Sequence, residues 1–221
     1  MNRVTAIILA AGEGRRYGAA KQFALLGGRT VLDHSLEKFQ AHEAVDRIVL
    51  VLPKGRPGKE FCERYGKIVA VARGGEKRQD SVYAGLNGLD AHQAEIILVH
   101  DGARPLVGMD LIGRLIEATR EKGAVVPVIP VEDTIKCVED QRVFRTEDRS
   151  RLFRSQTPQG FFYSLLKEAF VRAIGDSFYG TDEAVLVERM GRDVFVIRGE
   201  RKNMKITTRE DLKMAEALIE D

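Results

Sequence analysis

Cysteine is scarce in this chain, and neither a strong charge of one sign nor a long apolar run is present. Cys62 and Cys137 lack the spacing of a zinc site or a disulfide framework, which predicts two free thiols in a reducing compartment. The formal net charge of +2 supplies no broad field for nucleic acid or an anionic membrane. The apolar run 4–11 is too short to span a bilayer and leads directly into charged residues. We therefore expect a cytoplasmic protein with no membrane or nucleic-acid partner.

The remaining composition is that of an ordinary globular protein, with 44% hydrophobic and 31% charged residues in 221 positions. Apolar runs of strand length alternate with longer helical patterns. The expected strands are 4–9, 47–52, 68–72, 96–99, 124–129 and 194–198. The expected helices are 31–40, 59–65, 81–89, 110–121, 161–173, 182–190 and 209–219. This alternation predicts one α/β domain over residues 1–221, built on a doubly wound, mostly parallel sheet whose ligands bind at the carboxyl ends of the strands.

One stretch, residues 132–156, breaks this rhythm. Three β-prone pieces (134–138, 143–146 and 152–155) are separated by charged turns, and no helical face is long enough to dock on the sheet. We interpret the stretch, ending near Thr157, as a protruding β-arm rather than a second domain. A lone two-stranded ribbon is marginal in water, so the arm should need a partner surface.

The loop after the first expected strand is rich in small and basic residues. Small residues allow backbone N–H groups to approach a phosphate closely, and fixed positive charges complement a nucleoside triphosphate. Tyr17 stands where a dinucleotide fingerprint needs its third glycine, and no Gly-Lys-Ser/Thr of a Walker loop follows. A flexible glycine turn with solvated arginines is the alternative. The residues concerned are Ala10, Ala11, Gly12, Gly14, Arg15, Arg16 and Lys21.

Further motifs follow the loop in a fixed order along the chain. They are Lys21-Gln22-Phe23, Arg73-Gly74-Gly75, Arg78-Gln79-Asp80-Ser81-Val82, His100-Asp101-Gly102-Ala103-Arg104-Pro105, Asp133-Thr134-Ile135-Lys136, Thr157-Pro158-Gln159, Thr181-Asp182-Glu183-Ala184 and Asn203-Met204-Lys205-Ile206-Thr207. With the loop, this set resembles the 2-C-methyl-D-erythritol 4-phosphate cytidylyltransferases of the non-mevalonate isoprenoid pathway. The resemblance covers essentially the whole chain and implies a Rossmann-like nucleotidyltransferase fold. Gly102 stands where the family form has alanine.

The resemblance also implies a reaction and a set of site residues. A cytidylyl group would pass from CTP to 2-C-methyl-D-erythritol 4-phosphate with release of pyrophosphate. Magnesium would be the cofactor, held mainly by the nucleotide, with no dedicated metal-ligand residues. The enzyme would be a homodimer with exchanged arms. The implied catalytic residues are Arg16, Lys21 and Lys205. The implied nucleotide-binding residues are Ala10, Ala11, Gly12, Gly14, Arg15, Gly74, Gly75, Ser81 and Gly102. The implied acceptor-binding residues are Asp101, Arg104, Thr134, Arg149 and Thr157.

Several alternatives remain open at this point. Ribitol-5-phosphate cytidylyltransferases form a sister family, but their loop tends to read Leu-Ala-Gly-Gly where this chain has Ala10-Ala11-Gly12. A nucleotide-binding regulator without catalysis would not need all of Arg16, Lys21 and Lys205. Individual residues also have structural alternatives: Ser81 as a helix N-terminal residue and Asp101 with Arg104 as a brace for a turn.

Overall fold

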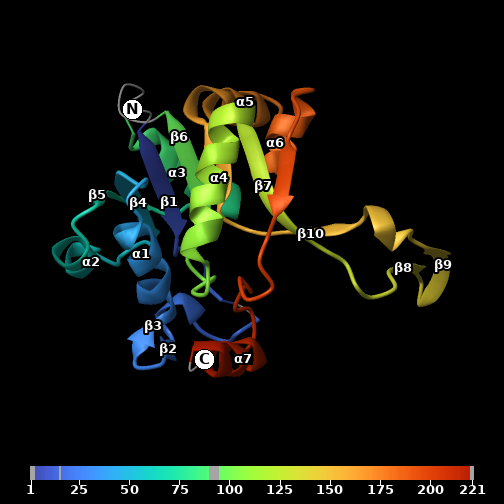
Figure 1. Cartoon of the computed structure of the whole chain (residues 1–221), viewed down its shortest axis with the longest axis horizontal. Helices are drawn as coiled ribbons and strands as arrows, with labels where there is room; N and C mark the ends of the chain where they lie inside the picture. Colours follow the sequence, from blue (N-terminus) through green and yellow to red (C-terminus); the bar gives the residue numbers. More distant parts are fainter. Residues whose placement is uncertain (1–2, 15, 90–94, 220–221) are drawn as a thin grey trace.

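A mostly parallel sheet forms the centre of the computed structural model, which describes residues 3–14, 16–89 and 95–219 (Figure 1). Within these residues the main sheet has eight strands in the order β10-β7-β11-β6-β1-β4-β5, with β12 also paired to β7. The strands are β1 (Val4–Leu9), β4 (Arg47–Leu52), β5 (Ile68–Arg73), β6 (Ile96–Asp101), β7 (Ala124–Pro130), β10 (Phe153–Ser155), β11 (Gln159–Phe162) and β12 (Phe195–Arg198). Two separate hairpins pair β2 (Leu25–Leu26) with β3 (Arg29–Thr30), and β8 (Lys136–Glu139) with β9 (Arg142–Thr146). The predicted α/β class is confirmed.

Helices cover both faces of this sheet. The helices are α1 (Val31–Ala41), α2 (Lys59–Arg64), α3 (Arg78–Asn87), α4 (Met109–Lys122), α5 (Tyr163–Gly175), α6 (Ala184–Arg189) and α7 (Arg209–Ile219), with short 3₁₀ turns η1 (Lys21–Phe23) and η2 (Arg149–Arg151). In β1, the buried Ala6 and Ile8 face the core under α1, α2 and α4, whereas Ile7 faces the core under α3, α5 and α6. This burial on both faces explains the continuous apolar runs of the central strands. None of the described helices is long and apolar enough to cross a membrane.

The sequence pattern missed one strand of the main sheet. We expected a helix over 161–173, but residues Gln159–Phe162 form β11, which lies antiparallel between β6 and β7. The helix α5 begins only at Tyr163. Phe161 is fully buried and pairs with Ile97 of β6. The strand runs into the helix without a turn, so its short apolar run reads as the first turn of the helix.

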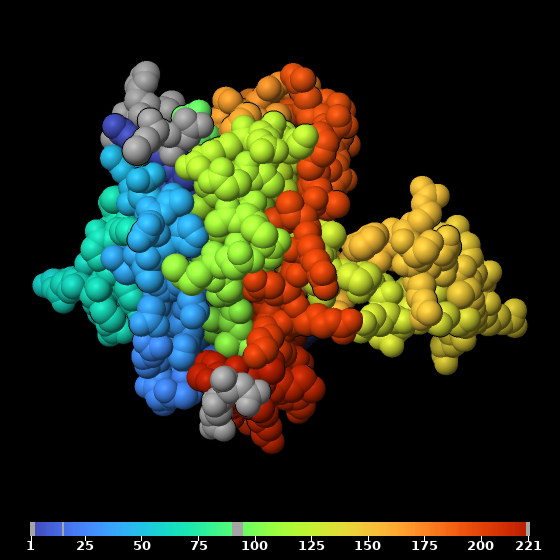
Figure 2. All heavy atoms as spheres, viewed as in Figure 1, coloured from blue at the N-terminus to red at the C-terminus, as the bar shows by residue number. Residues whose placement is uncertain are grey.

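The arm is shorter than the sequence suggested. Strands β8 and β9 project from the body as a two-stranded ribbon (Figures 1 and 2). The third expected piece, 152–155, instead contributes β10, which pairs antiparallel with β7 at the edge of the main sheet. The ribbon leaves large apolar side chains exposed, namely Val138 at 56%, Val143 at 57% and Phe144 at 63%. Such exposure supports the expectation that the arm packs on another surface.

Phe161→Ala tests the role of β11 in the core. We expect a loss of about 3–5 kcal/mol in the free energy of unfolding, because truncation of a buried phenylalanine removes apolar contact and leaves a cavity. Urea denaturation measures this loss. Phe195→Ala on β12 is the matched control, since that ring is 40% exposed. Equal losses in the two variants would contradict a central position for β11.

Candidate active site

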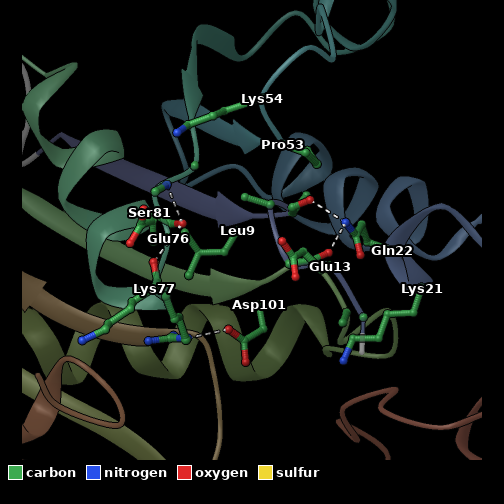
Figure 3. Close-up of a pocket in the computed structure, with 18 of the residues that line it drawn as sticks. Leu9, Glu13, Lys21, Gln22, Pro53, Lys54, Glu76, Lys77, Ser81 and Asp101 are labelled. Atoms are coloured by element: carbon green, nitrogen blue, oxygen red, sulfur yellow. Dashed lines mark hydrogen bonds and ion pairs between the residues drawn. The ribbon is translucent and has the colours of Figure 1, made fainter. Parts of the chain in front are cut away.

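The loops that follow four parallel strands line one cleft. Strands β5, β4, β1 and β6 run parallel and lie side by side, so their carboxyl ends meet at one edge of the sheet. The chain leaves β1 toward β4 and later returns to β6 on the other side, which makes the β1–β6 boundary a switch point where ligands bind in such sheets. A cleft of about 660 Å³ opens there (Figure 3). Its lining includes Ala10, Ala11, Gly12, Gly14, Lys21, Gly74, Gly75, Ser81, Asp101 and Lys205.

The glycine loop after β1 is fixed from beneath by one buried side chain. The Gln22 amide donates hydrogen bonds to the carbonyls of Ala10 at 2.7 Å and Gly12 at 3.0 Å. Gly14 adopts a φ of +68°, and a Cβ there would lie 1.8 Å from the Ala19 carbonyl oxygen. Gly12, in contrast, has open space where a side chain would be. The loop therefore holds its shape and still presents bare backbone to the cleft, as an anion-binding loop requires.

Ala11, Gly74, Gly75 and Ser81 line another part of the cleft, which we call the slot. A Cβ on Gly74 would lie 2.1 Å from the Ala11 Cβ, so these two residues already touch. The Ser81 hydroxyl accepts a hydrogen bond from the Gly75 N–H at 3.1 Å and donates one to the Lys77 carbonyl at 3.2 Å. Ser81 lies in the first turn of α3, so it both holds the glycine pair and keeps one acceptor lone pair free.

Positive charges converge on the middle of the cleft. Lys21 on η1 and Lys205 after β12 both line it, and the exposed Arg16 lies near enough to act on Lys21. Burial lowers the pKa of Lys21, and repulsion from Lys205 and Arg16 lowers it further. Mutual repulsion of this kind is relieved by a polyanion such as a triphosphate.

Asp101, the last residue of β6, is the negative centre of the site. Its Oδ2 lies 2.7 Å from Lys205 Nζ, and its Oδ1 accepts a hydrogen bond from Arg78 Nε at 3.0 Å. Arg104 Nε lies 4.0 Å from Oδ2. Burial alone would raise the pKa of Asp101, but attraction to Arg78, Lys205 and Arg104 outweighs burial and holds the pKa well below its usual range. Asp101 is therefore an ionised acceptor of hydrogen bonds at neutral pH.

Buried polar residues fix Asp101 and the Lys205 loop from behind. The Thr157 hydroxyl accepts a hydrogen bond from the Asp101 backbone N–H at 3.0 Å, and the Thr157 carbonyl accepts one from the Asn203 amide at 2.8 Å. The Asn203 carbonyl accepts from Arg104 at 2.8 Å. His100 is fully buried, and burial lowers its pKa to about 3. His100 is thus a neutral residue of the buried framework behind the site.

Not every predicted site residue lines the cleft. Gly102, Arg104 and Thr157 lie directly behind its wall, where Gly102 donates its N–H to the Leu9 carbonyl. Thr157, which the resemblance implies binds the acceptor, is buried beside Asp101 of its own chain. Thr134 and Arg149 are exposed on the arm. Arg15 lies outside the described residues.

Sequence reasoning quoted Gln22, Arg78 and Glu183 within motifs but assigned them no role in the site. Arg78 lines the cleft, and its Nη1 donates to both Glu183 oxygens at 2.7 and 2.9 Å. One signal was available for Glu183: a charged residue directly before the apolar run 184–187.

A glycine loop at the first strand of a parallel sheet, with lysines around a buried aspartate, is typical of nucleotidyltransferases. Comparison with known proteins narrows the class. Residues 4–221 match the family described as 2-C-methyl-D-erythritol 4-phosphate cytidylyltransferase. The chain belongs to this family, as its motifs predicted, and it is therefore a cytidylyltransferase enzyme.

Relatives and solved structures agree over nearly the full length. The chain is 45% identical to the protein of that name from Geobacillus thermodenitrificans, over 97% of this chain and 96% of the relative. It is 42% identical to the one from Geobacter metallireducens, over 99% and 98%. The crystal structure of the Thermus thermophilus protein of that name superposes with a TM-score of 0.84 at 37% identity, over 99% of this chain and 100% of that chain. The crystal structure of 4-diphosphocytidyl-2C-methyl-D-erythritol synthase from Anaerococcus prevotii gives 0.86 at 33% identity, over 100% and 99%.

Lys21→Ala should lower kcat by about 10²–10³, the usual effect of removing one preorganised charged donor. Its folding should not suffer. A lysine whose folded pKa is lowered carries its charge at a cost below that pKa, so at pH 7 removal should leave the free energy of unfolding unchanged or raised. Steady-state kinetics and urea denaturation measure the two effects. Lys59→Ala, whose side chain is 84% exposed on α2, is the control. A well-folded Lys21→Ala protein with normal kcat would remove Lys21 from the site.

Proposed function

We infer that this enzyme transfers the cytidylyl group of CTP to 2-C-methyl-D-erythritol 4-phosphate, giving 4-diphosphocytidyl-2-C-methyl-D-erythritol and pyrophosphate. The observation that carries the inference is the joining, in one cleft, of the glycine loop, the Gly74-Gly75 pair held by Ser81, and the charged centre around Asp101. An oxygen of the acceptor phosphate attacks the α-phosphorus, and pyrophosphate leaves with the electron pair of the broken bond. The nucleophile is already ionised, so no base is needed, and catalysis depends on positioning and charge stabilisation.

The positions of the cations suggest a separate role for each in binding the two substrates. Lys21 and Arg16, beside the glycine loop, hold the triphosphate and the charge that develops at the α-phosphorus. Lys205 approaches from the Asp101 side of the cleft and binds the acceptor's phosphate. Asp101, with an ionised carboxylate, accepts hydrogen bonds from the acceptor's hydroxyls. This assignment gives His100 no catalytic role.

The Ser81 hydroxyl favours cytosine over uracil. The Ser81 hydroxyl has one hydrogen donated to Lys77 and one acceptor lone pair occupied by Gly75. The remaining lone pair can accept from the exocyclic amine of cytosine, whereas uracil presents a carbonyl acceptor there.

Magnesium fits this site as a companion of the nucleotide. Within the described part of the chain, no group of three or more His, Cys, Asp or Glu side chains is arranged to hold a metal. Magnesium keeps several waters and uses one or two carboxylates plus substrate phosphates, so such a cage is not required. Glu13 is a carboxylate of the cleft's lining that would face the ion. When bound, magnesium offsets charge on the phosphate oxygens.

Turnover of two acceptors tests the proposed reaction. With CTP and magnesium, we expect faster pyrophosphate release with 2-C-methyl-D-erythritol 4-phosphate than with ribitol 5-phosphate. Faster turnover with ribitol 5-phosphate would instead indicate a ribitol-5-phosphate cytidylyltransferase. Tight CTP binding without release from either acceptor would favour the non-catalytic regulator.

We further propose that residues 1–221 act as one domain that dimerises by exchanging arms. The support is the exposed apolar ribbon β8–β9 and the placement of Thr134 and Arg149 on the arm, outside the cleft's lining. A two-fold dimer would bring each arm to the partner's cleft, where Arg149 suits the acceptor's phosphate. The cytoplasm is the expected compartment, since unpaired thiols such as Cys62 and Cys137 are typical of reducing surroundings.

Subunit mixing tests the shared site. Lys21→Ala and Arg149→Ala homodimers should each be inactive. After exchange about half the dimers are mixed, and each mixed dimer has one site with both lesions and one intact site. We therefore expect recovery of about a quarter of wild-type activity. Verified subunit exchange with no recovered activity would place the whole site in one chain.

A further inference from the structure

Glu183 is a buried carboxylate that the reaction outlined above does not use. It is 1% exposed, and burial raises its pKa despite the attraction of Arg78. Both of its oxygens accept hydrogen bonds from Nη1 of Arg78, at 2.7 and 2.9 Å. Burying a carboxylate costs desolvation energy, so its presence at this position needs a structural or functional explanation.

Two structural reasons for Glu183 are weak. It occupies the N-cap position of α6, but its side chain makes no capping hydrogen bond there. The neighbouring Asp182 fills that need, because its Oδ1 accepts from the Val185 N–H at 3.2 Å. A buried ion pair is also poor support for net stability, since desolvation offsets most of the attraction.

The geometry around Arg78 suggests a functional reason. Arginine facing a single carboxylate tends to bind both of its oxygens in a fork. Here Glu183 engages Nη1, and Arg78 meets Asp101 through Nε on Oδ1 alone at 3.0 Å. The second oxygen of Asp101 remains for Lys205, at 2.7 Å. Arg78 and Lys205 thus each hold a different oxygen of Asp101.

We propose that Glu183 is a positioning residue for acceptor binding, acting through Arg78 on Asp101. Glu183 holds Arg78 on Oδ1 of Asp101. Oδ2 of Asp101 can then release Lys205 and accept a hydrogen bond from a hydroxyl of a polyol phosphate. The released Lys205 then binds the phosphate of the same molecule. The charge of Asp101 stays balanced throughout, because Arg78 does not move. This inference rests on the proposed reaction, since it assigns the exchange to that acceptor.

Glu183→Gln tests the proposal with little change of shape. The amide keeps one acceptor for Arg78 but loses the charge that holds the guanidinium. We expect kcat/KM for the acceptor to fall about 10–100-fold, the usual cost of misplacing a reacting group. The KM for CTP should change less than about threefold, because the phosphate loop and slot do not touch Glu183. The urea midpoint should fall, because Arg78 loses the charge of its buried partner, so kinetics are compared under conditions where circular dichroism shows both proteins folded. Glu168→Gln, the same change in the exposed pair with Arg172 on α5, is the matched control.

A double-mutant cycle distinguishes positioning from a general structural role. If Glu183 acts through Arg78, adding Glu183→Gln to Arg78→Met should cause almost no further loss of acceptor kcat/KM. Additive losses, or equal losses for CTP and acceptor, would overturn the proposal. Arg78→Met alone tests the same contact if Glu183→Gln does not fold. The acceptor's kcat/KM should again fall more than that of CTP.

A crystal structure of Glu183→Gln separates this inference from the reaction itself. We expect Arg78 to turn its fork onto both oxygens of Asp101 and to displace Lys205. An unchanged arrangement of Arg78, Asp101 and Lys205 would overturn the positioning role. Failure of the wild-type enzyme to release pyrophosphate would instead overturn the proposed reaction, and the structure of the variant would still decide the role of Glu183.

Discussion

The ionised carboxylate of Asp101 is the interaction on which the site depends. Burial opposes its charge, and attraction to the nearby cations Arg78, Lys205 and Arg104 keeps it ionised. Each cation comes from a different part of the chain: the start of α3, the loop after β12 and the turn after β6. Asp101 therefore ties three elements to the end of β6. An aspartate that was neutral, or paired with a single arginine, would fix neither the Lys205 loop nor the mouth of the cleft.

Repulsion between cations destabilises the cleft, and a bound triphosphate offsets that repulsion. Lys21 and Lys205 repel each other, and this repulsion lowers the pKa of Lys21. The stability that tolerates this comes from elsewhere, since both faces of the sheet are packed with fully buried side chains such as Ile7 and Phe39. A triphosphate adds negative charge between cations that repel each other. Substrate binding and folding are thus linked, because the ligand removes repulsion that the fold otherwise carries.

Elements with long, regular patterns could be predicted from the sequence, whereas elements that depend on partners could not. The helix Arg209–Ile219 was predicted residue for residue, and the two-sided strands were found as apolar runs. The last two residues of strand β11 were predicted as helix, because the strand is defined by pairing with Ile97 and Ala124 rather than by its own period. The piece 152–155 was assigned to the arm, although its hydrogen bonds are made with β7 in the main sheet.

The sequence by itself determined those features of the site that are formed by residues close together in the chain. These are the glycine loop, the lysine that follows it and the aspartate at the end of a strand. Backbone freedom and residue type depend on neighbours in the chain, so motifs record them. Only the tertiary structure decided which charges meet. Arg78 reaches Glu183 across 105 positions, and Thr157 reaches Asp101 across 56. No local pattern encodes such pairs, because their energy arises from shared burial, and burial exists only once the sheet and its helices are packed together.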